Sequence, residues 1–291
     1  MELGKVGIWS AEFRSRDAGD AGAAAAEIEE LGFGTLWIPG GAGGNIFGAV
    51  TRALDGSQTM PVATGILNVW MHDATEVAAE HARISALHPD RFLLGLGVSH
   101  AMAVEATDRR YERPRSVMVH YLDELDAAKT PVRREDRVLA ALGPKMLELA
   151  RDRSAGAHPY LTTPEHTQRA RSILGDGPLL APEQMVVLET DPTAARALAR
   201  NSLALYLQLP NYTNNMLRSG FTEADLADGG SDRLIDGLIA WGGLEAIAGR
   251  IREHLDAGAD HVCIQVLTGS RDRYPLAEWR ELAAILPGLP T

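Results

Sequence analysis

Apolar, β-rich runs alternate with segments of helical periodicity along the whole chain. The predicted strands are 5–10, 35–38, 61–69, 91–98, 138–142, 158–161, 185–189 and 261–267. The helices predicted after them are about 17–31, 49–54, 75–87, 114–129, a segment starting at 144, 163–174, 191–209 and 276–286. Eight strands, each followed by a helix and with no break in composition, predict an α/β protein. The expected fold is one (β/α)8 TIM barrel in a single domain over residues 1–291.

The stretch 211–258 is too long for a simple connection between the last two strands. It contains polar turns and two segments with helical patterns, 231–239 and 244–255. We therefore expect a helical insertion between strands seven and eight.

The segment 137–161 carries the clearest chemical signal. A continuous apolar run, typical of a strand covered on both faces, ends at Gly143-Pro144, and a helical pattern follows. A helix N-terminus at the carboxyl end of a buried strand can hold an anion. The segment therefore favours an enzyme with a phosphate-bearing cofactor.

Composition narrows the function classes. The chain has 291 residues and a formal net charge of -11, which argues against non-specific nucleic-acid binding. A single cysteine, Cys263, excludes an intrachain disulfide and a cysteine metal cluster. The chain begins without a signal-peptide pattern, and no run approaches the length of a membrane span. We expect a cytoplasmic protein with no membrane partner.

The predicted strand ends, where a barrel enzyme has its active site, are poor in metal ligands and nucleophile motifs. They are apolar, aromatic and rich in backbone groups, which suits a site where a bound organic cofactor supplies the reactivity. Trp9, Trp37 and Trp70 lie at or near these ends and are candidates to shape a slot for a flat redox ring. The alternative for each is that it plugs the barrel rim.

Two histidines lie at predicted strand ends: His100 follows the fourth strand, and His158 begins the sixth. His100 is a candidate for proton transfer near neutral pH, with a hydrogen-bonded loop histidine as the alternative. For His158 we favour an architectural role near a cofactor over proton transfer. Lys145, at a helix N-terminus, either assists an anion or is simply solvated.

Long blocks of the chain resemble the luciferase-like superfamily, and more narrowly its coenzyme F420-dependent oxidoreductases of actinobacterial type. These blocks are LWIPGG, ATGILNVW, RFLLGLGVSH, RVLAALGPKMLELA, GAHPYLTTPEHTQRAR, LPNYTNNMLRSGF and AGADHVCIQVL. The resemblance implies a TIM barrel with an insertion after strand seven, usually a homodimer. It also implies a deazaflavin, or FMN in relatives, lying across the strand ends and acting without a metal.

The resemblance also assigns site residues. A bulged third strand with a non-proline cis peptide would back the ring, and His100 falls where some relatives hold a catalytic Glu. The positions that match cofactor contacts are Gly65, Ile66, Leu67, Asn68, Val98, Ser99, Leu142, Gly143, Lys145, Met146, Gly156, Ala157 and His158.

One departure stands out after strand two, where relatives usually carry an acidic residue or an Asp-His pair. This chain has Gly40 and Gly41, so the proton must come from elsewhere, and His100 is the first choice. The leading hypothesis is an F420-dependent oxidoreductase that transfers a hydride between the deazaflavin and a small organic substrate. The alternatives are an FMN-dependent monooxygenase and a non-catalytic cofactor-binding barrel.

Overall fold

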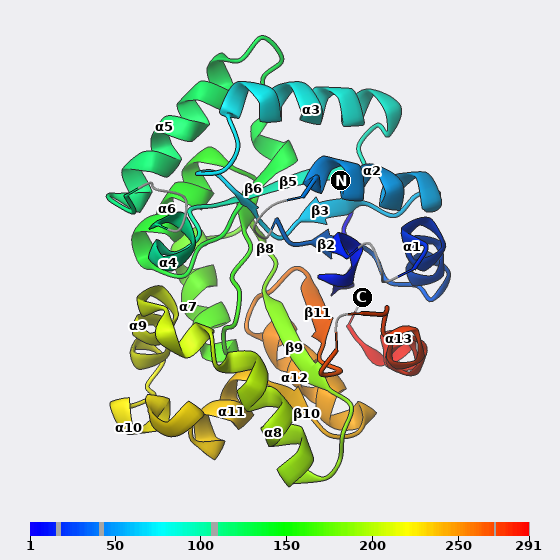
Figure 1. Ribbon diagram of the computed structural model, residues 1–291, viewed down its shortest axis with the longest axis vertical. Coiled ribbons are helices and arrows are strands. Elements are labelled where there is room, and N and C mark those ends of the chain that lie inside the picture. The colour runs from blue at the N-terminus through cyan, green and yellow to red at the C-terminus, as the bar shows by residue number, and fades with distance from the viewer. Residues whose placement is uncertain (16–18, 41–43, 106–109, 271, 291) are drawn as a thin grey trace.

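A computed structural model describes residues 1–15, 19–40, 44–105, 110–270 and 272–290 of the chain. Its strands form one parallel sheet (Figure 1). They are β1 (Val6–Trp9), β2 (Leu36–Ile38), β3 (Val62–Thr64), β4 (Leu67–Asn68), β5 (Phe92–Gly97), β6 (Arg137–Leu139), β7 (Gly156–Ala157), β8 (Leu179–Leu180), β9 (Glu183–Val187), β10 (Ala240–Trp241) and β11 (Val262–Val266).

The sheet closes on itself through the stretch 179–187. On one side β8 pairs with β7, and on the other β9 pairs with β11, which in turn pairs with β1. β3 and β4 together supply the third barrel position, and β10 adds to β9 outside the ring. This arrangement is the (β/α)8 barrel that the sequence predicts, with eight strand positions built from ten of the strands.

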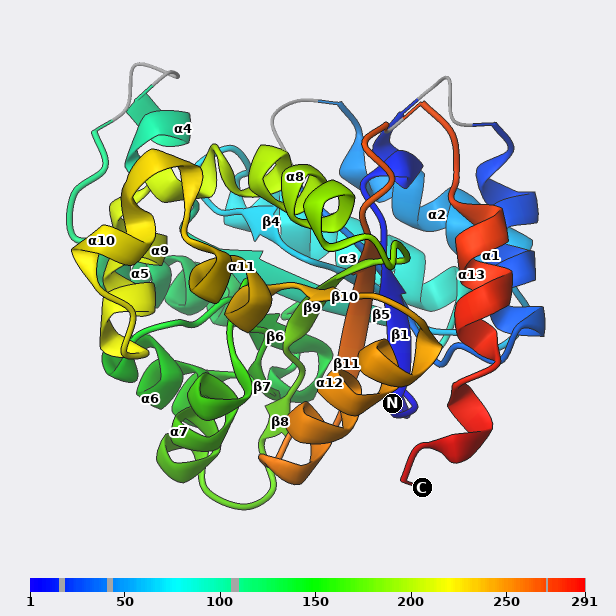
Figure 2. The ribbon, with the colours of Figure 1, turned by 90° about the horizontal axis from the view of Figure 1, so that it is seen from below.

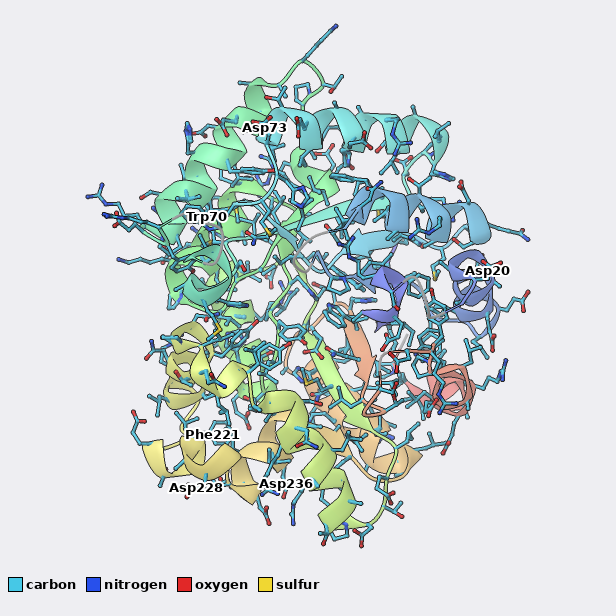
Figure 3. The ribbon with its side chains drawn as sticks, viewed as in Figure 1. Asp20, Trp70, Asp73, Phe221, Asp228 and Asp236 are labelled. Carbon is cyan, nitrogen blue, oxygen red and sulfur yellow. The ribbon has the colours of Figure 1, made fainter. Side chains whose placement is uncertain are left out.

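The main helices outside the insertion lie between or after the barrel strands in sequence, and most of them cover the outside of the barrel. They are α1 (Ala21–Glu30), α2 (Ile46–Gly56), α3 (Ala74–Leu87), α4 (Ala101–Glu105), α5 (Pro114–Ala127), α6 (Pro144–Arg153), α7 (Pro164–Leu174) and α13 (Leu276–Ala283). Short 3-10 helices are η1 (Glu12–Arg14), η2 (Arg134–Asp136) and η5 (Leu286–Gly288). Asp20 and Asp73, labelled in Figure 3, begin α1 and α3 by accepting backbone N–H bonds.

The insertion between β9 and β11 is confirmed, although it is not wholly helical because it includes β10. Its other elements are α8 (Pro192–Leu203), η3 (Tyr206–Gln208), α9 (Pro210–Arg218), α10 (Glu223–Leu226), η4 (Ala227–Gly229), α11 (Asp232–Leu238) and α12 (Leu244–Asp256). Figure 2 places α4 and α8 toward the end of the barrel where β1 terminates, with α9 close to α4. The α8 and α9 part of the insertion therefore lies toward the carboxyl-terminal end of the barrel, whereas α12 packs against α7 and β11.

Several predicted bounds are wrong; the fifth strand, for example, ends at Leu139 rather than at 142. The sixth strand is β7 and ends before the predicted range 158–161, because Pro159 has no N–H and the Leu161 N–H goes to the Glu183 carboxylate. The seventh strand begins at Leu179 rather than at 185, and it is divided into β8 and β9 by a break that contains Pro182. The predicted helix 191–209 stops at Leu203 and resumes as separate turns.

Candidate active site

A cavity of about 900 Å³ opens at the carboxyl ends of the barrel strands. The described residues that line it come from nearly every strand end and from the insertion. They are Trp9, Ala11, Arg14, Ser15, Pro39, Gly40, Gly44, Gly65, Ile66, Asn68, Met71, Val98, Ser99, His100, Tyr111, Pro114, Ala140, Ala141, Leu142, Gly143, Met146, His158, Tyr160, Tyr206, Asn211, Tyr212 and Asp272. Its position and mostly apolar lining are those of a cofactor or substrate site in a barrel enzyme.

The Gly65–Ile66 segment forms one wall of this cavity between β3 and β4. The peptide bond that joins the two residues is cis, as the resemblance implies. The indole N–H of Trp9 donates to the Gly65 carbonyl at 2.9 Å, and the Gly40 N–H donates to the Ile66 carbonyl at 3.0 Å. A Cβ on Gly65 would lie 2.8 Å from Trp9 Nε1 and 3.1 Å from His158 Nε2. Only glycine therefore fits at residue 65.

His158 is buried beside this wall. Its Nδ1 lies 2.7 Å from the Ala181 carbonyl, which can only accept, so Nδ1 carries the proton. Its ring stacks on Trp37 at 4.2 Å, and burial lowers the pKa of His158 to about 4. His158 is therefore neutral near pH 7. Trp37 itself donates to His261 at 3.0 Å and lies inside the barrel rather than in the cavity.

His100 follows β5 and also lines the cavity. The preceding Ser99 has a φ of 55°, and the imidazole packs against Tyr212 with a ring separation of 5.2 Å. Burial lowers the pKa of His100, and a hydrogen bond with Asn211 partly opposes that shift. The neutral imidazole is therefore the main form near pH 7. Its Nδ1 is buried without a hydrogen-bond partner among the described residues.

The start of α6 lies at one end of the cavity, and it is the helix N-terminus that the sequence predicts as an anion site. Gly143 is the N-cap residue, in extended conformation, and a Cβ there would meet nothing within 4 Å. Leu142 and Met146 line the cavity beside it, whereas Lys145 is exposed and is not among the lining residues. The helix N-terminus thus faces an open space that can take an anionic group.

Most of the predicted cofactor positions come together in this one cavity. Leu67, Gly156 and Ala157 instead lie buried in strands and do not line it, and Lys145 points elsewhere. Trp9 lines it, while Trp70, labelled in Figure 3, packs on Tyr111 and donates to the Val98 carbonyl at 2.9 Å. Gly41 lies outside the described residues.

Sequence reasoning missed the aromatic side of the cavity. Tyr160 follows β7, whereas Tyr206 and Tyr212 come from η3 and α9 of the insertion. Tyr160 O–H donates to Gln265 at 2.7 Å, so the Tyr206 hydroxyl, 2.9 Å away, donates to Tyr160. The block LPNYTNNMLRSGF contains Tyr212, but nothing in its pattern indicates that it covers a strand end.

Glu183 lies inside the barrel, fully buried on β9. One carboxylate oxygen accepts the Leu161 N–H at 3.1 Å, and the other has no partner among the described residues. Burial raises the pKa of Glu183 to about 8, which the Leu161 hydrogen bond only partly opposes. Glu183 is therefore mainly protonated at neutral pH.

A second cavity, of about 670 Å³, lies at the opposite end of the barrel beside Leu3, Lys5 and His261. No catalytic group from a strand's carboxyl end reaches it, so it is not the candidate site. Over the described residues, no group of three or more His, Cys, Asp or Glu side chains is placed to hold a metal. Within the same residues, no helix is long and apolar enough to cross a membrane.

The barrel, with a cavity at its strand ends, has the architecture that the resemblance to the luciferase-like superfamily implies. The family model for luciferase-like monooxygenase matches residues 6–130, which confirms the resemblance seen in the sequence. No curated protein matches the chain by sequence.

Solved structures with the same fold align over almost all of the chain. An F420-dependent secondary alcohol dehydrogenase in complex with an F420-acetone adduct is 14% identical, with a TM-score of 0.77 and 100% of both chains covered. The coenzyme F420-dependent tetrahydromethanopterin reductase from Methanopyrus kandleri is 15% identical, with a TM-score of 0.70 and full coverage of both. The oxygenating constituent of 3,6-diketocamphane monooxygenase from Pseudomonas putida, in complex with FMN, is 12% identical, with a TM-score of 0.72 and 98% of each chain covered. At these identities the likeness establishes the fold.

Proposed function

We propose that this protein is an F420-dependent oxidoreductase that transfers a hydride between the deazaflavin and a small organic substrate. The observation that carries the proposal is the convergence of nine of the thirteen predicted cofactor positions, and of His100, on one cavity at the strand ends. The F420-dependent enzymes among the structures of like fold support the choice of cofactor. The FMN complex of like fold supports an FMN-dependent monooxygenase as the second candidate.

The residues of the cavity fit such a ring. A volume of about 900 Å³ lies within the usual range for cofactor sites, and Ile66, Val98 and Ala140 give it apolar walls. Gly143 leaves open space at the start of α6, where backbone N–H groups suit the phosphate of a cofactor tail. When bound, a deazaflavin supplies a ring carbon that gives or accepts hydride.

The remaining chemistry falls to the protein. Trp9 fixes the wall at Gly65 through its indole N–H, which orients whatever lies against that wall. His100, neutral because it is buried, accepts the proton of a substrate hydroxyl as hydride leaves its carbon, and returns it in the reverse direction. This role replaces the acid or base that Gly40 cannot provide.

Titration of the purified protein with F420 and with FMN tests the proposal. We expect F420 to bind more tightly and His100→Ala to slow hydride transfer while leaving the F420 Kd unchanged. Tighter FMN binding with oxygen consumption would instead support the monooxygenase, and unchanged turnover in His100→Ala would remove its role. Binding without turnover on any substrate would favour a non-catalytic protein.

The unbroken alternation of strands and helices supports a single domain over residues 1–291, and the family resemblance supports a homodimer. We also propose a cytoplasmic location. Size-exclusion chromatography with light scattering tests the dimer directly.

A further inference from the structure

An aromatic wall lines one side of the cavity, and we define it as Trp9, His100, Tyr160, Tyr206 and Tyr212. Its rings form a continuous series: Trp9 to Tyr160 at 5.4 Å, Tyr160 to Tyr206 at 5.6 Å, Tyr206 to Tyr212 at 5.0 Å and Tyr212 to His100 at 5.2 Å. The angle between the Tyr206 and Tyr212 rings is 86°, an edge-to-face arrangement. The wall therefore offers both faces and edges to an occupant of the cavity.

Three chain segments remote in sequence hold the wall in place. Tyr206 O–H donates to Tyr160, and Tyr160 O–H donates to Gln265 on β11. This chain of hydroxyls joins η3 of the insertion to the barrel. The tyrosine rings are therefore positioned before any ligand binds, which lowers the entropic cost of binding.

The wall is uncharged. Among the described residues that line the cavity, only Arg14 and Asp272 carry a formal charge, and they come from the first and last strand ends. The lining residues between Pro39 and Tyr212 contribute no charged side chain. Burial raises the pKa of Tyr160 and of Tyr212 well above the ordinary value, and a carboxylate placed beside them would lose its hydration in the same way.

Polar groups suited to one neutral oxygen accompany the rings. Asn211 and His100 both line the cavity next to Tyr212, and their side chains can donate to a carbonyl or accept from a hydroxyl. We propose that the aromatic wall is a substrate subsite for an uncharged aromatic compound that carries one carbonyl or hydroxyl group. This inference rests on the proposed function, because it places the substrate between the aromatic wall and the cofactor.

A matched set of three probes tests the subsite: acetophenone, benzoate and cyclohexyl methyl ketone. Binding is measured by calorimetry on the protein saturated with whichever cofactor it binds, and also on the protein alone. We expect acetophenone to bind at least tenfold more tightly than benzoate, and severalfold more tightly than the saturated ketone. Equal or tighter binding of benzoate, or no preference for the aromatic ketone, would overturn the proposal, as would failure of all three to bind.

Variants of Tyr212 separate the wall from the cofactor site. Tyr212→Leu should weaken acetophenone about tenfold and Tyr212→Phe should restore it, with the cofactor Kd unchanged in both. An equal loss of cofactor affinity in Tyr212→Leu would assign the wall to the cofactor and overturn the proposal. If Tyr212→Leu fails to fold, the probe series on the wild-type protein still decides. If neither F420 nor FMN binds but the probe pattern holds, the proposed function fails and the subsite stands.

Discussion

Glu183 offers the sharpest test of the physical description of the barrel interior. Its carboxyl group is fully buried, and one oxygen has no partner among the described residues. Burial raises the pKa of Glu183 from the ordinary 4.5 to about 8. Folding therefore keeps this group protonated over a pH range in which the unfolded chain ionises it.

The sign and size of the effect follow from linkage. Because the folded pKa is raised, the favourable contribution of neutral Glu183 is complete below pH 4.5 and is lost as pH rises toward 8. Each unit of pKa difference corresponds to about 1.4 kcal/mol, so the unfolding free energy loses about 3 kcal/mol between pH 5 and pH 8 through this group. Glu183→Gln keeps the shape and removes the titration.

The assay is chemical denaturation of both proteins at pH 5 and pH 8. We expect the unfolding free energy of Glu183→Gln minus that of the wild type to be about 3 kcal/mol larger at pH 8 than at pH 5. Glu281→Gln, at an exposed position on α13, is the matched control for the loss of one carboxyl group. A difference between wild type and Glu183→Gln that is the same at both pH values would refute the reasoning.

Three further predictions concern the cavity. Gly65→Ala places a Cβ 2.8 Å from Trp9 Nε1, so this variant should lose about 1–3 kcal/mol of stability and bind the cofactor more weakly. Gly143→Ala has open space around it and should lose less than about 1 kcal/mol. Thermal unfolding and cofactor titration compare the two variants. Trp9→Phe removes the donor to Gly65 and should cost about 1 kcal/mol by denaturation, and no loss would mean that this bond does not hold the wall. Because burial lowers the pKa of His100, kcat/KM should fall only as pH drops below 6.5. This decrease at acid pH should be absent in His100→Ala. If the variant retains it, the decrease belongs to another group.

The barrel could be predicted from sequence because its strands are short apolar runs punctuated by glycine and proline. Strand ends were harder, since they depend on distant partners. The sixth strand stops early because the Leu161 N–H is taken by Glu183, which lies 22 residues further along the chain. No local pattern records that contact.

The candidate site divides in the same way. Residues in the short connections after strands, such as Gly65, Ser99 and Gly143, could be placed because strand ends converge in a barrel. Tyr206 and Tyr212 could not, because their place over the cavity depends on how the insertion packs on the barrel. Lys145 shows the opposite error: it is next to Gly143 in sequence, yet its side chain is exposed outside the cavity.

The central claim is that the cavity at the strand ends binds a deazaflavin. Equilibrium titration of the wild-type protein and of Gly65→Ala with F420 and with FMN tests it most directly, by absorbance or fluorescence of the cofactor. The account predicts that F420 binds the wild type more tightly than FMN does, and that Gly65→Ala weakens this binding at least tenfold. Tighter binding of FMN, or F420 binding that Gly65→Ala leaves unchanged, would contradict it.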